Sequence, residues 1–231
     1  MADTPTPSVA PSAPTLRRSH PLASREEDLR ALTGGSVGVR PHLAMAVVRA
    51  AVPGPAARAA EDVLGTALPT RPNTWAPAAP GGGGEPGAVV WLGPDEWLVL
   101  ADEPRPEALE ERLRAALVPV GGSAVDVSAQ RMSLRLRGAH ARDVLAAGCA
   151  VDTHPAVFGA GTSAQTLLGQ AGVVLLSRSD AGDDYEVLVR SSFARYLADW
   201  LLDAFVEHRG AEAPRDPAPD PVRPTTGGAT P

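Results

Sequence analysis

Apolar and polar residues alternate in several short runs of this 231-residue chain, and elsewhere they recur at three- and four-residue spacing. Alternation predicts half-buried strands, whereas the longer spacing predicts amphipathic helices. In 132–137 methionine and leucine alternate with serine and arginine, and 139–147, after Gly138, has helical spacing. Together with an apolar strand predicted to be buried at 124–127, these segments form an α+β unit near the middle of the chain.

The remaining patterns extend this α+β organisation over most of the sequence. Helices are predicted at 26–32, 56–64, 106–118 and 193–207, and further strands at 44–52, 88–92, 96–101, 165–168, 173–177 and 185–190. The last helix is expected to bury Phe193, Leu197, Trp200, Leu201 and Ala204. The first half has the order β-α-β-β-α-β, which is the split β-α-β arrangement. We therefore predict two packed ferredoxin-like halves.

Proline, glycine and serine mark the expected boundaries between these halves and their flanking segments. Residues 1–18 and 210–231 are too rich in proline and small polar residues to pack, so we expect a disordered arm and a disordered tail. The halves are placed at 19–122 and 123–209. A flexible loop is expected at 69–87, because it contains several prolines and four consecutive glycines.

Composition excludes several function classes. The net charge of −6 and the pI of about 5.4 argue against a nucleic-acid partner. The chain has no lysine, which excludes a Walker A loop, a pyridoxal Schiff base and a lysine general base. Its single cysteine, Cys149, cannot form an internal disulfide. With no signal-peptide pattern and no apolar run near the roughly 20 residues that span a bilayer, a cytoplasmic location without membrane contact is expected.

Two glycine motifs match catalytic or cofactor-binding patterns by letter only. The segment 34–38 matches G-x-S-x-G, but a helix precedes it and a strand is predicted after it, the reverse of a nucleophile elbow. The segment 159–164 matches G-x-G-x-x-A with Asp180 beyond it, but no strand precedes it and no helix follows. We interpret the first as a helix stop and the second as a loop.

The titratable residues show no catalytic or metal-binding spacing. The histidines are scattered and lack the spacing of zinc ligands: His20, His42, His140, His154 and His208. Cys149 follows an apolar helix and is expected to be buried and inert. Asp126 and Asp152 follow valines at strand ends, so both are expected to be partly buried and to cap the next turn. We predict no catalytic residue, no cofactor-binding residue and no metal ligand.

Several segments, taken in order, resemble the gamma subunit of heterotetrameric sarcosine oxidase. They are SHPL (19–22), LP with PNT (68–74), WLGPDEWL (91–98), VDVS (125–128), GCAVD (148–152), QTLLG (165–169) and RSSF (190–193). The resemblance implies a non-catalytic structural or assembly subunit of a complex that also contains alpha, beta and delta chains. That complex oxidises sarcosine to glycine and hydrogen peroxide and transfers the one-carbon unit to tetrahydrofolate. The resemblance places FAD, FMN, NAD and tetrahydrofolate on the partner subunits.

The second half is also similar to the folate-binding domain of glycine-cleavage aminomethyltransferases. The shared features are Asp126-Val127-Ser128, the alternating strand and Gly138 before a helix. The family's paired aspartates fall on Leu175 and Leu176, and leucine cannot replace a carboxylate that holds the folate amine. Because the other features are shared, a folate-binding aminomethyltransferase-like protein acting alone is kept as the alternative function. A free-standing interaction module is a third possibility. Trp75 is the expected subunit contact, although an indole folded back on the core is the competing interpretation.

Overall fold

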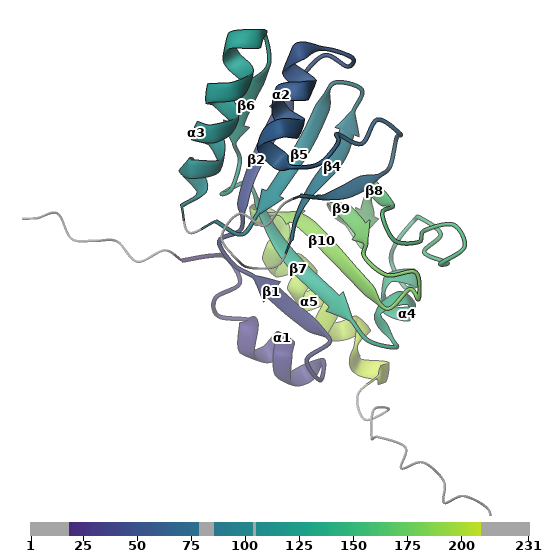
Figure 1. Ribbon diagram of the computed structural model, residues 1–231. Helices are drawn as coiled ribbons and strands as arrows, with labels where there is room; N and C mark the ends of the chain where they lie inside the picture. The colour runs from purple at the N-terminus through teal and green to yellow at the C-terminus, as the bar shows by residue number, and fades with distance from the viewer. Residues whose placement is uncertain (1–18, 79–85, 104, 209–231) are drawn as a thin grey trace, which may run out of the picture.

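Two antiparallel sheets pack face to face between two layers of helices in the computed structural model, which describes residues 19–78, 86–103 and 105–208 (Figure 1). Sheet 1 has the order β3-β4-β5-β2-β6, and sheet 2 has the order β1-β7-β10-β9-β8. Helices α2 and α3 cover the outer face of sheet 1, whereas α1, α4 and α5 cover that of sheet 2. The expected α+β class is confirmed.

The strands and helices have the following bounds. Sheet 1 is built from β2 (Ala44–Arg49), β3 (Trp75–Ala78), β4 (Gly87–Gly93), β5 (Glu96–Ala101) and β6 (Ser123–Asp126). Sheet 2 is built from β1 (Val37–Arg40), β7 (Arg131–Arg137), β8 (Ser163–Leu168), β9 (Ala171–Ser177) and β10 (Asp184–Arg190). The helices are α1 (Glu26–Leu32), α2 (Pro55–Leu64), α3 (Pro106–Leu117), α4 (Ala141–Ala146) and α5 (Ala194–Ala204). Short 3-10 turns follow α3 and flank α5.

The two sheets have the same internal strand order. In sheet 1 the order β6-β2-β5-β4 is the 4-1-3-2 order of a β-α-β-β-α-β unit. In sheet 2 the same order is β1-β7-β10-β9, but its fourth strand comes from the start of the chain. Strand β6 (123–126) was expected in the second half but pairs within sheet 1, and β1 (37–40) was expected in the first half but pairs within sheet 2. Two strands therefore lie on the other side of the expected division between 122 and 123. The division itself stays a prediction.

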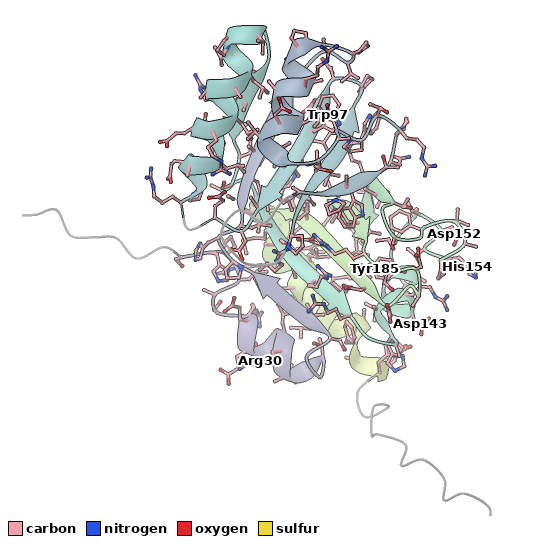
Figure 2. All side chains as sticks on the ribbon, in the orientation of Figure 1. Arg30, Trp97, Asp143, Asp152, His154 and Tyr185 are labelled. Carbon is pink, nitrogen blue, oxygen red and sulfur yellow. The ribbon has the colours of Figure 1, made fainter. Side chains whose placement is uncertain are left out.

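Three apolar clusters account for the layers. One cluster fills the space between sheet 1 and its helices and contains Trp97, whose Nε1 donates to the Pro69 carbonyl oxygen at 2.8 Å (Figure 2). A second lies between sheet 2 and its helices and contains Tyr185. The third joins the two sheets, with Leu98 and Leu100 on one side and Val174, Leu176 and Leu188 on the other. Because successive side chains of a strand point to opposite faces, each central strand buries one face against its helices and the other against the second sheet.

Local chemistry explains where the helices begin and end. Pro55 and Pro106 occupy the first helical positions of α2 and α3, where a missing N–H has no cost. Gly65 closes α2 in the left-handed conformation that glycine adopts without strain. Gly148, in the GCAVD segment, has a packing role, since an added Cβ would lie 2.4 Å from Cζ2 of Trp200.

Three expectations about individual segments were wrong. The interval 69–87 was expected to be a flexible loop, but it contains strand β3. Its residues 79–85 lie outside the described residues, and so do the arm expected at 1–18 and the tail expected at 210–231. The strand expected to be buried at 124–127 is the edge strand β6, in which Val125 is 51% exposed because only β2 pairs with it. Phe193, expected to be buried, is 43% exposed and lies before α5, within the 3-10 turn.

Tyr185 is expected to make the stability of the fold decrease at alkaline pH. Its side chain is fully buried, and its hydroxyl donates to the Thr153 carbonyl oxygen at 3.2 Å. Burial raises the pKa of Tyr185, Asp183 adds to this shift, and Arg142 opposes it. The folded pKa lies above the unfolded value, so the contribution to stability is present below about pH 10 and is lost as pH rises through the folded pKa.

We expect Tyr185→Phe to remove this alkaline loss. At neutral pH the variant should be less stable by about 1 kcal/mol, because the buried Thr153 carbonyl loses its donor. Between about pH 9 and 11 its free energy of unfolding should fall less steeply than that of the natural chain. Urea denaturation across this range measures both, and parallel pH profiles for the two chains would contradict the assignment.

Candidate functional site

The two segments that connect sheet 1 with sheet 2 cross each other at one place, and a cleft lies beside the crossing. One linker joins β1 to β2 and the other joins β6 to β7. The Met45 N–H donates to Ser128 Oγ at 2.9 Å, and the Val127 N–H donates to the Met45 carbonyl oxygen at 2.8 Å. The adjoining cavity of about 350 Å³ is lined by both linkers and by residues 19–21. We call it the crossover cleft.

The polar groups of the crossover cleft are largely held by one another. Asp126 accepts hydrogen bonds from both the N–H and the hydroxyl of Ser128. The imidazole of His20 lies 5.6 Å from that of His42, edge to face, and its Nε2 lies 3.3 Å from Glu26 Oε1. Ser128 is not paired with either histidine among the contacts described. The arrangement positions the chain crossing, and the described residues of the cleft form no nucleophile–base pair.

A second polar cluster lies between the sheets, around Glu186, and we call it the arginine cluster. Glu186 is fully buried and accepts from Arg40 Nη1 at 3.0 Å and from Arg178 Nε at 2.7 Å. It also accepts from the buried Ser133 hydroxyl at 2.7 Å. Arg135 lies with its Nη1 4.0 Å from Glu186 and binds Asp184 through two nitrogens. This network ties β1, β7, β10 and the residue that follows β9 together by charge-assisted hydrogen bonds.

Arg178 connects the arginine cluster to the residue expected to contact another subunit. Burial lowers the pKa of the Arg178 guanidinium, while its bonds to Glu186 raise it. The guanidinium carbon lies 4.8 Å from the centre of the Trp75 ring, in cation–π geometry. Trp75 Nε1 donates to the Ser177 carbonyl oxygen at 2.9 Å, and the indole is half-buried. Trp75 therefore packs back on the core and bridges β3 to the end of β9, while a role as subunit contact stays a prediction.

The other residues singled out from the sequence hold turns. Asp126 and Asp152 each accept from the N–H two residues on, at 3.0 Å and 2.8 Å, so the predicted capping role is confirmed. Both are exposed, however, because they lie at an edge strand and in a surface loop, so the expected burial was wrong (Asp152 in Figure 2). Asp180 accepts from Ala160 N–H at 2.8 Å and fixes the loop at 159–162; the last two residues of the segment interpreted as a loop, 163 and 164, begin strand β8. Cys149 is half-buried beside the sheet 2 core rather than fully buried.

The arginine cluster was missed by sequence reasoning, although one signal for it was present. The alternation of 131–137 puts three arginines and a serine on one face of β7, and alternation alone does not show that this polar face packs against another layer. In the described part of the chain, no three histidine, cysteine or acidic side chains lie close enough to hold a metal ion. No described helix combines the length and apolarity that crossing a membrane requires.

Comparison with known sequences identifies one family. A sequence model of the sarcosine oxidase gamma subunit family matches residues 49–207. The chain is 37% identical over 195 residues to sarcosine oxidase subunit gamma of Arthrobacter sp., covering 84% of this chain and 92% of that protein. It is 36% identical over 195 residues to the subunit gamma of Corynebacterium sp. strain P-1, with the same coverage.

Two solved structures share the fold. A chain of heterotetrameric sarcosine oxidase from Corynebacterium sp. U-96 aligns over 85% of this chain and 98% of its own length, with a TM-score of 0.74 and 30% identity. Aminomethyltransferase T of the glycine cleavage system from Bartonella henselae aligns over 75% of this chain and 48% of its own length, with a TM-score of 0.54 and 15% identity. The second likeness concerns the fold alone.

Proposed function

This chain belongs to the sarcosine oxidase gamma subunit family, and we propose on that basis that it is a structural subunit of a heterotetrameric sarcosine oxidase. The observation that carries the proposal is the alignment with the Corynebacterium oxidase chain over nearly the full length of that chain. An alignment over nearly the whole of that chain supports a role as the equivalent subunit rather than as a fragment or an unrelated domain.

In the proposed complex the partners are the alpha, beta and delta chains, located with this chain in the cytoplasm. FAD, FMN, NAD and tetrahydrofolate would be held by those partners, where sarcosine is oxidised to glycine and hydrogen peroxide. This chain would contribute no catalytic residue. Support comes from Asp126, Ser128 and Asp152, which all serve in fixed hydrogen bonds that hold turns or linkers.

The alternative, a folate-dependent transferase acting alone, is less well supported by the packing. The acidic pair of that family falls on Leu175 and Leu176, and both leucines are fully buried. Leu175 packs toward the helices of sheet 2, and Leu176 packs between the sheets, so neither position offers a charge to a folate amine. Titration of the full chain with tetrahydrofolate should give no saturable binding. Tight, stoichiometric binding would favour the transferase.

Omission of this chain from a co-expressed oxidase tests the proposed role. We expect the other three chains to yield less assembled, sarcosine-oxidising complex when this chain is left out, and full yield when it is supplied. A three-chain enzyme with the same yield, activity and thermal stability would mean that this chain is not a structural subunit.

We expect Trp75→Ala to reduce recovery of the complex more than it reduces the stability of the isolated chain. The stability loss should be about 1–3 kcal/mol, because the variant loses the Nε1 donor and the ring beneath Arg178. Leu109→Ala, a buried substitution in α3, serves as a matched destabilised control with an expected loss of about 2–5 kcal/mol. If the two variants are equally stable and give equal amounts of complex, Trp75 is not a subunit contact.

A further inference from the structure

Two arginines lie directly opposite each other at one end of sheet 2. Arg131 begins β7 and Arg190 ends β10, and the two are cross-strand partners. Directly opposed side chains in a sheet lie about 5 Å apart at Cβ, so like charges there are destabilising. Their neighbours Met132 and Val189 point into the helix-side core, which places both arginines on the face that looks toward sheet 1.

Neither arginine of this pair has a counterion among the described residues. Arg131 donates to the side-chain oxygen of Gln130, which carries no charge. Burial lowers the pKa of Arg131, Arg190 lowers it further, and only the field of Glu96 opposes them. Glu96 itself lies 2.6 Å from Arg49. Within the described residues, the partly buried guanidinium of Arg131 therefore lacks an ion-pair partner, in contrast to Arg40 and Arg178, which both bind Glu186.

The surface beside the arginine pair is open and partly apolar. An open hollow of about 490 Å³ is lined by both arginines and by Gln165, Leu167 and Gly172. Leu167 is 52% exposed, and nothing lies within 4 Å of the position that a Cβ on Gly172 would take. Small-molecule sites are usually concave pockets that enclose their ligand, whereas protein interfaces are more open and are enriched in arginine.

We propose that Arg131 and Arg190 bind a carboxylate side chain of another oxidase subunit, and that an adjacent apolar side chain of that subunit packs on Leu167. Charge complementarity supports this occupant, because two directly opposed cations repel each other and would be stabilised by a carboxylate supplied from another chain. A carboxylate can accept from two guanidinium groups at once, which converts a repulsive pair into a charge-assisted site. The proposal rests on the proposed subunit role.

The test uses the full chain and a preparation of the other three oxidase subunits. The double variant Arg131→Gln/Arg190→Gln is compared with Arg30→Gln/Arg58→Gln, which makes the same charge change at exposed helix positions (Arg30 in Figure 2). We expect the first variant to bind the partner subunits at least about tenfold more weakly and with less salt dependence, and the second to bind within about twofold of the natural chain.

The melting temperature of the isolated chain distinguishes a subunit contact from a merely structural role. Removing a repulsive cross-strand pair should leave the melting temperature of the isolated chain unchanged or higher, while assembly weakens. If the natural chain assembles and the double variant assembles equally well, the inference fails and the subunit role stands. If the natural chain does not assemble, both fail. Saturable stabilisation of the isolated chain by succinate that depends on Arg131, with assembly intact, would assign the pair to a small dicarboxylate and overturn the inference.

Discussion

Replacing Glu186 with glutamine is expected to destabilise the fold by about 3–5 kcal/mol, because a buried ion pair that loses one partner leaves its other charges uncompensated. Glu186 is fully buried and accepts from two arginines and from Ser133. The glutamine has nearly the same volume but keeps one neutral oxygen and brings two new donors. Arg40 and Arg178 would then lose the buried anion that they share.

Urea denaturation of the isolated chain measures this loss. Glu111→Gln is the matched control, because Glu111 lies 3.6 Å from Arg105 in a pair with both side chains about two-thirds exposed. The control should change the free energy of unfolding by less than about 1 kcal/mol. Similar midpoints for the two variants would mean that Glu186 does not hold the strands of sheet 2 together.

Trp97→Ala is the second large expected loss, also about 3–5 kcal/mol, since it removes the largest fully buried side chain of the fold's described part. The indole fills the space between sheet 1 and helices α2 and α3 (Figure 2). Its Nε1 also fixes the segment at Pro69 that leads toward β3. Deleting it leaves a cavity beside sheet 1 and removes the side-chain donor to the Pro69 carbonyl oxygen.

Trp91 offers the comparison, because it is the cross-strand partner of Trp97 but is only partly buried. We expect Trp91→Ala to cost less than half of the Trp97→Ala loss in thermal or urea unfolding. The two sheets share the apolar cluster between them, so Trp97→Ala should lower one transition rather than split it in two. Equal losses for the two tryptophans would contradict the packing described.

Local pattern predicted most elements of the fold because their causes are local. The proline at the start of α3 and its leucines at helical spacing were visible in the sequence, and the hairpin of β4 and β5 was visible from its turn at 93–95. The strand β3 was not, because it has only four residues and contains Pro77. The exchange of β1 and β6 between the sheets depends on pairing between distant segments, which no local periodicity encodes.

The candidate sites divide in the same way. The capping carboxylates were predicted because an aspartate acts on an N–H only two residues away. Glu186 looked like an ordinary polar position of an alternating strand, and only the pairing of β10 with β7 and β9 brings arginines to it. The opposition of Arg131 and Arg190 likewise appears only once the register of those strands is known.

The most direct test of the subunit role is native mass spectrometry of material purified through an affinity tag on this chain. The cells would express all chains of the oxidase. We predict that the tag recovers a heterotetramer containing this chain, with sarcosine-dependent production of hydrogen peroxide in the same fraction. Recovery of the tagged chain alone, with the oxidase activity left entirely in the untagged fraction, would contradict the role proposed for it.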